Sequence, residues 1–450
     1  MASTHPETAA RTLARYAAGL QLRDVPSPAI DRARQCVIDT VGVALFGSRL
    51  PWSRVASRYA THYGGSGTSR VVGTSSRVSA PLAALANGVA AHAYELDSLR
   101  KPGAGVHPGA ALVPVALALG EELHASGADL LAALIAGCEV MFRIGMASKH
   151  SSEALGFHAP GLTGAFGAAV TAARLLRLDA QRTVQAIGIA GSLCSGVLAF
   201  AKADNGAMVK RLHLGRAAES GILAARWAED GFEGPDTILE GRFGFLDVYC
   251  EQSDASLLTR ALGERFETQS LCIKRYPCHV TAHTPVQSIE ALRREHGFVA
   301  DDIAGITVRA SAKVVSHHAA HEAHDIMAVQ YSVPLCVAIA CVDDPDDPDA
   351  FGERALRNGK VSELARIVDC QAGPTEWSGW ASEVCVALRD GRIFTRFADD
   401  FNGTPTRPLG GEELRRKYLR CAGDFADARR LLEQLEAIET IDDVASLALG

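Results

Sequence analysis

The segment "GAFGAAVTAARLLRLDAQRTVQAIGIAG" at residues 164–191 shows the pattern that decides the fold of the first part of the chain. Its apolar and small residues recur at spacings of three and four, the period of a helix with one or more buried faces. The segment "PAIDRARQCVIDTVGVALFG" at residues 28–47 has the same pattern. From residue 6 to about residue 265 we therefore predict packed helices that contact one another through small residues.

The pattern changes near Ser270. The segment "IAGITVRAS" at residues 303–311 alternates apolar and polar positions like a half-buried strand. In "EVCVALRDGRIFTRF", residues 383–397, two β-rich runs flank Asp390-Gly391, which is a strong short-range signal of a hairpin. After "FNGTPTRPLGG" the sequence becomes helical again. We predict an α+β second region and a helical C-terminal tail that packs back onto the first.

The composition is that of an ordinary globular protein with more than one core. A chain of 450 residues is long for a single core, and 48% of its residues are hydrophobic and 22% charged. Lys and Arg number 45 and Asp and Glu 52, giving a net charge of −7 without any basic block, so nucleic acid is not an expected partner. The 11 cysteines form no CxxC pair, which favours free thiols and a cytoplasmic location.

The sequence predicts neither a signal peptide nor a membrane span. The first 20 residues lack a continuous apolar core and a cleavage-like end. The longest uncharged apolar run, "AIGIAGSLCSGVLAFA" at residues 186–201, is shorter than the ~18 to 20 residues that a span needs. We interpret this run as a buried helix of a bundle.

No metal or organic cofactor is predicted from motifs. The cysteines and histidines that lie near one another in sequence do not have the spacing of a zinc or iron–sulfur site; they are Cys272, Cys278, His317, His318, His321 and His324. There is no Walker loop and no GxGxxG motif that follows a strand. Any chemistry is therefore expected to come from side chains.

Five segments combine an acid or base with glycine or proline, as expected where backbone approaches a ligand. They are "YELDSLRKPGAGVHPG", "GFHAPGLTG", "NGAMVKRLHLGR", "IKRYPCHVTAH" and "AVQYSVP". In the first of them, "KPGAGVHPGA" has the character of an anion-binding loop followed by a helix that begins near Pro108. The alternative is a solvated turn between helices with a capping histidine. Each segment is weak evidence alone, and their co-occurrence indicates an active site.

The chain resembles the MmgE/PrpD family over nearly its whole length. The resemblance rests on blocks in family order: "ALANGVAAHAYELD", "HPGAALVPVALALGE", "GFHAPGLTGAFGAA", "MVKRLHLGRAAESGILAA", "GFEGPDTILEGRFGF", "IKRYPCHVTAH", "AVQYSVP" and "GTPTRPLGGEELRRKY". It implies a large all-helical domain made of residues 1–268 and 405–450, and a smaller α+β lid domain of residues 269–404. It also implies an active site between them, a homodimer, and catalysis without metal or organic cofactor.

The same resemblance assigns the site residues. It implies catalytic roles for His107, His158, His279 and Tyr331, with Glu95 or Asp97 orienting His107 or relaying its proton. It implies that Lys210 and Lys274, with Arg100 or Lys101, bind the carboxylates of the substrate. These residues are all present in the sequence.

The first block departs from the family pattern, which usually reads Asp-x-Asp-Asp-Thr before the HP histidine. Here the aligned residues are Glu95 to Leu99, and the loop to His107 is two residues longer. The leading Asp has become Glu, and Leu99 stands where the threonine hydroxyl is expected, so the usual substrate cannot be assumed.

Three functions remain open at the level of sequence. The first is a lyase that dehydrates or decarboxylates a small di- or tricarboxylic acid resembling 2-methylcitrate or aconitate. Such reactions move a proton next to a carboxylate, which histidines near neutrality and cationic side chains support. The second is an isomerase that epimerises a dicarboxylate such as iminodisuccinate. The third is a silent homologue that binds without catalysis, against which the retained histidines, lysine and tyrosine argue.

Overall fold

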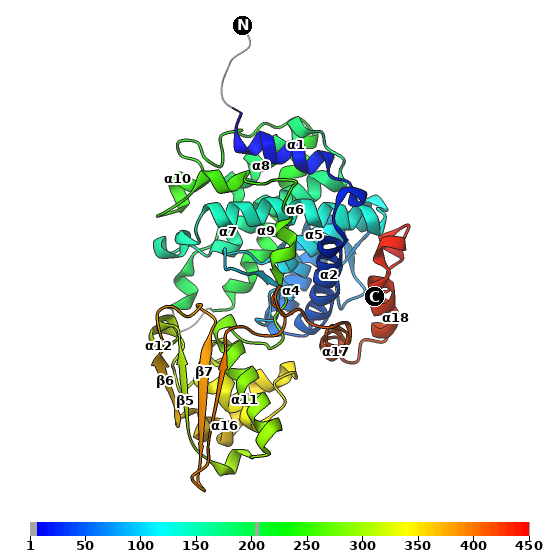
Figure 1. Ribbon diagram of the computed structural model, residues 1–450. Helices are drawn as coiled ribbons and strands as arrows, with labels where there is room; N and C mark the ends of the chain where they lie inside the picture. Colours follow the sequence, from blue (N-terminus) through cyan, green and yellow to red (C-terminus); the bar gives the residue numbers. More distant parts are fainter. Residues whose placement is uncertain (1–6, 203–206, 450) are drawn as a thin grey trace. The chain divides into compact units, whose positions relative to one another are not determined.

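The computed structural model describes residues 7–202 and 207–449, and it divides into two compact units. Unit 1 contains residues up to Ala93, Asp97–Cys272 and Gly411–Gly450, and unit 2 contains Tyr94–Leu96 and Ile273–Gly410. Unit 1 is helical and unit 2 combines helices with a four-stranded sheet (Figure 1). The predicted fold class is therefore confirmed.

Unit 1 is built from long helices with short two-stranded pairs at their edges. Its helices are α1 (Ala9–Gly19), α2 (Ser27–Ser48), α3 (Pro51–Tyr63), α4 (Ala80–Ala91), α5 (Pro108–Leu123), α6 (Gly127–Ala147), α7 (Ala159–Leu175), α8 (Ala180–Leu193), α9 (Val209–Glu229), α10 (Phe245–Tyr249), α17 (Gly411–Ala422) and α18 (Ala428–Glu436). The strands β1 (Ser69–Arg70) and β2 (Arg77–Val78) pair with each other, as do β3 (Leu99–Arg100) and β4 (Leu271–Cys272).

The helix predicted over residues 186–201 is shorter than expected. Helix α8 ends at Leu193, and the chain then passes through Gly196, whose φ of 134° lies outside the range of a helix. Helix α6 is the one described helix that is long and apolar enough to cross a membrane, but 94% of its most apolar window is buried inside unit 1. It also carries a buried ion pair between Arg143 and Glu139, at 2.5 Å. We interpret α6 as a core helix.

Small residues let the helices of unit 1 approach closely, as the sequence predicted. Helices α4 and α9 meet at Gly88 and Gly215, and a Cβ added to Gly215 would lie 2.4 Å from the carbonyl oxygen of Leu85. Helices α7 and α9 meet at Gly221, where an added Cβ would lie 2.3 Å from the Cβ of Ala168. No side chain fits at these contacts, so the glycines set the distance between the helices.

The C-terminal segment belongs to the helical unit. Helix α17 packs on α2, and Lys417 donates to Asp39 across this contact at 2.5 Å, with both side chains buried. Figure 1 shows α17 and α18, at the red end of the chain, beside α2. The first and last parts of the chain therefore share one core.

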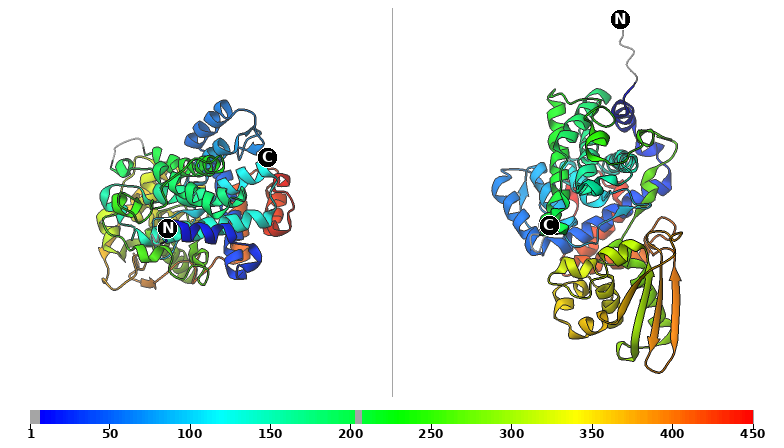
Figure 2. Two further views of the ribbon diagram at one scale, coloured as in Figure 1. Left: turned by 90° about the horizontal axis from the view of Figure 1, so that it is seen from above. Right: turned by 90° about the vertical axis from the view of Figure 1, so that its left-hand side faces the viewer.

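Unit 2 has a sheet in the order β6-β5-β7-β8, with β5 and β6 parallel and the other pairs antiparallel. The predicted strand and hairpin are confirmed: they are β5, β7 and β8, and Gly391 takes a φ of 90° in the turn. Helices lie on one side of the sheet in the right-hand view of Figure 2. The elements are β5 (Ile303–Ala310), β6 (Val368–Ala372), β7 (Ser382–Leu388), β8 (Ile393–Ala398), α11 (His283–His296), α12 (Ala312–His317), α13 (Ile326–Tyr331), α14 (Val333–Val342), α15 (Glu353–Arg357) and α16 (Gly359–Ala365).

The glycine contact between α4 and α9 predicts a stability defect. Gly215→Ala is expected to lower the free energy of unfolding by about 1–3 kcal/mol, because the added methyl group forces two helix backbones apart. Chemical denaturation with circular dichroism measures the effect. Gly19→Ala in α1 is the control, since nothing lies within 4 Å of its added Cβ. Equal stability of the two variants would contradict this account of the packing.

Candidate active site

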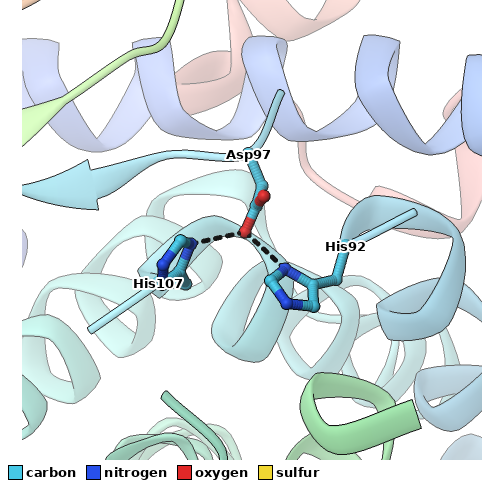
Figure 3. Close-up of side chains that lie close together, drawn as sticks. All are labelled: His92, Asp97 and His107. Carbon is cyan, nitrogen blue, oxygen red and sulfur yellow. Dashed lines mark hydrogen bonds and ion pairs between the residues drawn. The ribbon is translucent and has the colours of Figure 1, made fainter. Parts of the chain in front are cut away.

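Three side chains of unit 1, His92, Asp97 and His107, form a hydrogen-bonded cluster (Figure 3). Nδ1 of His92 lies 2.8 Å from Oδ2 of Asp97, and Nδ1 of His107 lies 2.7 Å from the same oxygen. His92 directly follows α4, whereas His107 is the N-cap residue of α5. Both imidazoles therefore donate Nδ1–H to one carboxylate oxygen, which leaves Nε2 of each ring as the acceptor atom.

Burial and the contacts within the cluster together determine which of its side chains are charged. Asp97 is fully buried, which by itself would raise its pKa, but His92 and His107 together hold that pKa well below its ordinary value. Burial lowers the pKa of His92 to about 3, and this outweighs the opposing effect of Asp97. We conclude that Asp97 is ionised and that His92 is a neutral donor.

A second imidazole pair lies in the same unit. Nδ1 of His158, the N-cap residue of α7, is 2.9 Å from Nδ1 of His213 on α9. Burial lowers the pKa of both rings; neighbouring His92 lowers that of His158 further, and Lys210 that of His213. Both rings are therefore neutral, and one donates its Nδ1–H to the other. The rings of His92 and His158 lie 6.0 Å apart between centroids, so the two clusters are neighbours.

Lys210 joins this group from the first turn of α9. It is 4% exposed and three residues before His213, so both side chains lie on one face of the helix. Its charge lowers the pKa of His92 as well as that of His213. The predicted carboxylate binder thus lies among the histidines of unit 1.

The start of α5 is held by the residues around it. Ser98 Oγ accepts a hydrogen bond of 3.1 Å from the backbone N–H of Gly109, in place of the N-cap side chain of His107. Thr163 of α7 donates to the carbonyl oxygen of Gly105 in the preceding loop, at 2.9 Å. These contacts fix the backbone around His107, and α5 begins at Pro108 as predicted.

Arg100 and Lys101 have structural contacts. The Arg100 guanidinium donates to Glu267 at 2.6 Å and to the carbonyl oxygen of Pro102 at 2.8 Å, and it is 4% exposed. The backbone N–H of Lys101 donates to the carbonyl oxygen of Ser270 at 2.9 Å. Leu99, which the sequence analysis compared with a threonine of the family pattern, is buried in β3. The role of Arg100 or Lys101 in substrate binding stays a prediction.

Unit 2 holds the remaining predicted residues in a group of its own. Lys274 donates to Oε2 of Glu95 at 2.9 Å, and the hydroxyl of Tyr331 donates to Oε1 at 3.3 Å. Glu95 has a φ of 55°, a conformation that costs a non-glycine residue about 1–2 kcal/mol. Such strain persists when surrounding contacts impose it, and it is common at functional sites. Glu95 is therefore fixed by Lys274 and Tyr331, and Asp97 is the acid that orients His107.

His279 lies in the same group of unit 2. Its ring stacks on His318 at 4.3 Å between centroids and lies 4.9 Å from the ring of Tyr331. Its Nδ1 is 2.9 Å from the hydroxyl of Thr281. His318 is buried, and burial lowers its pKa to about 4, so it is neutral.

The sequence analysis did not propose His92, His213 or His318 as active-site residues, and it considered His318 only as a metal ligand. His213 could have been found, because it lies three residues after Lys210 in a predicted helix. His92 could have been considered because it stands five residues before Asp97. His318 carries no such signal, since its contact with His279 spans 39 residues of sequence.

The His92–Asp97–His107 cluster is also the group of described residues that could hold a metal ion, since its ligand atoms all lie within 4.8 Å of one another. Both Nδ1 atoms lie at N–H···O distances from one oxygen, and a metal would have to replace both protons. The two Nδ1 atoms and Oδ2 of Asp97 are paired with one another, whereas Nε2 of His92 and Oδ1 of Asp97 have no hydrogen-bond partner among the described residues. We therefore interpret them as a hydrogen-bonded cluster, and metal-independent activity stays a prediction.

This prediction is tested by chelation. Dialysis of the purified protein against EDTA is expected to leave kcat and KM unchanged, because no step relies on a metal ion. Turnover is measured before and after dialysis, with elemental analysis as the control for metal removal. A loss of activity that added Zn²⁺ restores would contradict the prediction.

Comparison with known proteins decides the family. Residues 11–258 match the MmgE/PrpD N-terminal domain, and residues 276–443 match the MmgE/PrpD C-terminal domain. The chain belongs to the MmgE/PrpD family. It is 27% identical over 442 residues to the cis-aconitate decarboxylase of Homo sapiens. The aligned region covers 95% of this chain and 90% of that protein. It is 28% identical over 461 residues to the cis-aconitate decarboxylase of Aspergillus terreus. That aligned region covers 96% of this chain and 93% of the Aspergillus protein. These findings support an MmgE/PrpD-type lyase.

Proposed function

We propose that this member of the MmgE/PrpD family is a cofactor-independent lyase that decarboxylates a small di- or tricarboxylic acid. The observation that carries the proposal is the Asp97–His107 pair, a held imidazole in the same unit as Lys210 and the His158–His213 pair. The cis-aconitate decarboxylases among the relatives support decarboxylation over dehydration, and they make cis-aconitate the first substrate to test.

The binding part of the proposal assigns carboxylates to cations. Lys210 of unit 1 binds one carboxylate of the substrate, and a carboxylate-binding role for Lys274 stays a prediction. Lys210 and Lys274 are nearly buried, at 4% and 2% exposed, and low exposure to water strengthens the interaction of a cation with an anion. A polyanionic substrate is thus the class of ligand that these residues favour.

The chemical part uses the imidazoles. The carbon–carbon bond to one carboxylate breaks, carbon dioxide leaves, and the electron pair stays on the carbon skeleton as a carbanion next to a remaining carboxylate. The nearby ammonium group stabilises this charge. His107, protonated at Nε2 by solvent before this step, or the N–H group of His158 then delivers a proton to the carbon, and solvent restores that proton after the product leaves. Asp97 stabilises the protonated form of His107 and holds the ring in place.

Product analysis distinguishes this reaction from its alternatives. The protein is incubated in deuterated buffer with cis-aconitate, citrate, 2-methylcitrate and iminodisuccinate, and proton NMR follows each sample. Decarboxylation is expected to give carbon dioxide and one deuterium on the product carbon. Loss of water instead indicates a dehydratase, exchange of deuterium without loss of carbon indicates an epimerase, and no change in any sample would contradict catalysis on this substrate class.

Substitutions of Lys210 and His158 are expected to change different kinetic constants. Lys210→Ala should chiefly raise KM, because it removes binding that ground and transition states share. His158→Gln should lower kcat by about 10²- to 10⁴-fold, as for a lost general acid or base. His124→Gln is the control, since His124 is 67% exposed.

Thermal unfolding of each variant separates these effects from misfolding. A buried histidine with a structural role alone would lower stability and leave kcat per folded molecule unchanged. A near-normal kcat for His158→Gln would remove His158 from the mechanism and leave His107 and His279 as the candidates. The homodimer implied by the family resemblance and the cytoplasmic location favoured by the cysteine pattern stay predictions.

A further inference from the structure

We propose that His92 is a positioning residue whose Nδ1–H bond keeps Asp97 ionised and so makes Nε2 of His107 the nitrogen that exchanges a proton with the substrate. The inference rests on the proposed function, in which His107 transfers that proton. Neither the family resemblance nor the sequence motifs assigned a role to His92.

The exposure of the three side chains separates their roles. The side chain of His107 is 17% exposed, whereas those of His92 and Asp97 are 1% and 0% exposed. A ligand that enters from outside can therefore reach His107, while His92 lies behind the carboxylate. His92 acts on the reaction through Asp97 and not by touching the substrate.

Asp97 depends on its two imidazole donors. Its Oδ1 has no hydrogen-bond partner among the described residues, so the bonds from His92 and His107 to Oδ2 are the ones that replace water. A buried carboxylate that loses one of two donors holds its proton more tightly. A protonated Asp97 would donate O–H to Nδ1 of His107, and the ring would then carry its proton on Nε2. In that tautomer Nε2 has no lone pair with which to take up the proton that His107 later delivers, and no ionised carboxylate stabilises the protonated ring.

His92 performs this task as a neutral group. The charged or titratable groups that face it are Asp97, Lys210, His107 and His158. Burial is the largest effect on its pKa and lowers it to about 3, with Lys210 and His107 acting in the same direction. The donor therefore stays in place without adding a positive charge that would compete with His107 for Asp97.

Three substitutions test which atom of His92 matters. His92→Asn places an amide N–H near the position of Nδ1, His92→Gln places one near Nε2, and His92→Leu provides neither. We expect His92→Leu and His92→Gln to lower kcat by about 10²- to 10⁴-fold with little change in KM, as for a misdirected acid or base. We expect His92→Asn to keep kcat within about tenfold of the parent protein, because the donor to Asp97 is retained.

Two further measurements keep the outcome interpretable. Nitrogen-15 NMR of labelled histidine is expected to show His107 as the Nδ1–H tautomer in the parent and in His92→Asn, and as the Nε2–H tautomer in His92→Leu. Thermal unfolding reports whether each variant folds. Asn and Gln carry the same amide group at positions that differ by one methylene, so the comparison of these two variants stands even where His92→Leu does not fold.

The possible results distinguish the role of His92 from that of His107. Recovery of kcat by Gln and not by Asn would overturn the inference, because His92 would then act through Nε2. Lower stability with unchanged kcat in all variants, and no change in the His107 tautomer, would also overturn it. A switch of the His107 tautomer with unchanged kcat would leave the control by His92 standing and would overturn the role of His107 in the proposed function.

Discussion

The buried carboxylate of Asp97 is the constraint on which the site of the helical unit depends. An ionised carboxylate taken out of water costs several kcal/mol unless other donors replace the water. Here two imidazoles supply them, one five residues before Asp97 and one ten residues after it. The end of α4, the turn at Asp97 and the start of α5 must therefore converge on one oxygen atom, and this convergence fixes the ring of His107.

Close packing of helices brings the second imidazole pair to the same place. Helices α7 and α9 pack against each other, and a Cβ added to Gly161 in the first turn of α7 would lie 3.2 Å from the Cβ of His213. The same added Cβ at Gly161 would lie 2.4 Å from the carbonyl oxygen of Ser195. The absence of a side chain there lets α9 approach the start of α7, where His158 is the N-cap residue. The small-residue contacts thus position chemistry as well as helices.

The sequence predicted the elements well and the partners of individual side chains less well. Periodicity and turn signals identified the helical unit, the strand β5 and the hairpin of β7 and β8, because each follows from local patterns. The same patterns could not decide whether Glu95 or Asp97 orients His107, since both lie in one short turn. The φ of 55° at Glu95 and its bond to Lys274, 179 residues away, direct that side chain elsewhere. Contacts between residues so far apart in sequence cannot be predicted from the spacing of residues within a short segment.

The altered first block bears on substrate selection. Leu99 and Arg100 form β3, which pairs with Leu271 and Cys272, and the guanidinium of Arg100 is engaged by Glu267. Leu99 is buried, so its position offers a ligand neither a hydroxyl group nor another polar contact. A site that hydrogen-bonds a substrate group rejects analogues lacking it by about 10⁴- to 10⁵-fold, and an apolar residue cannot supply that discrimination. Under the proposed function, selection among carboxylic acids therefore falls to cations such as Lys210 and to the held imidazoles, and not to the side chain of Leu99.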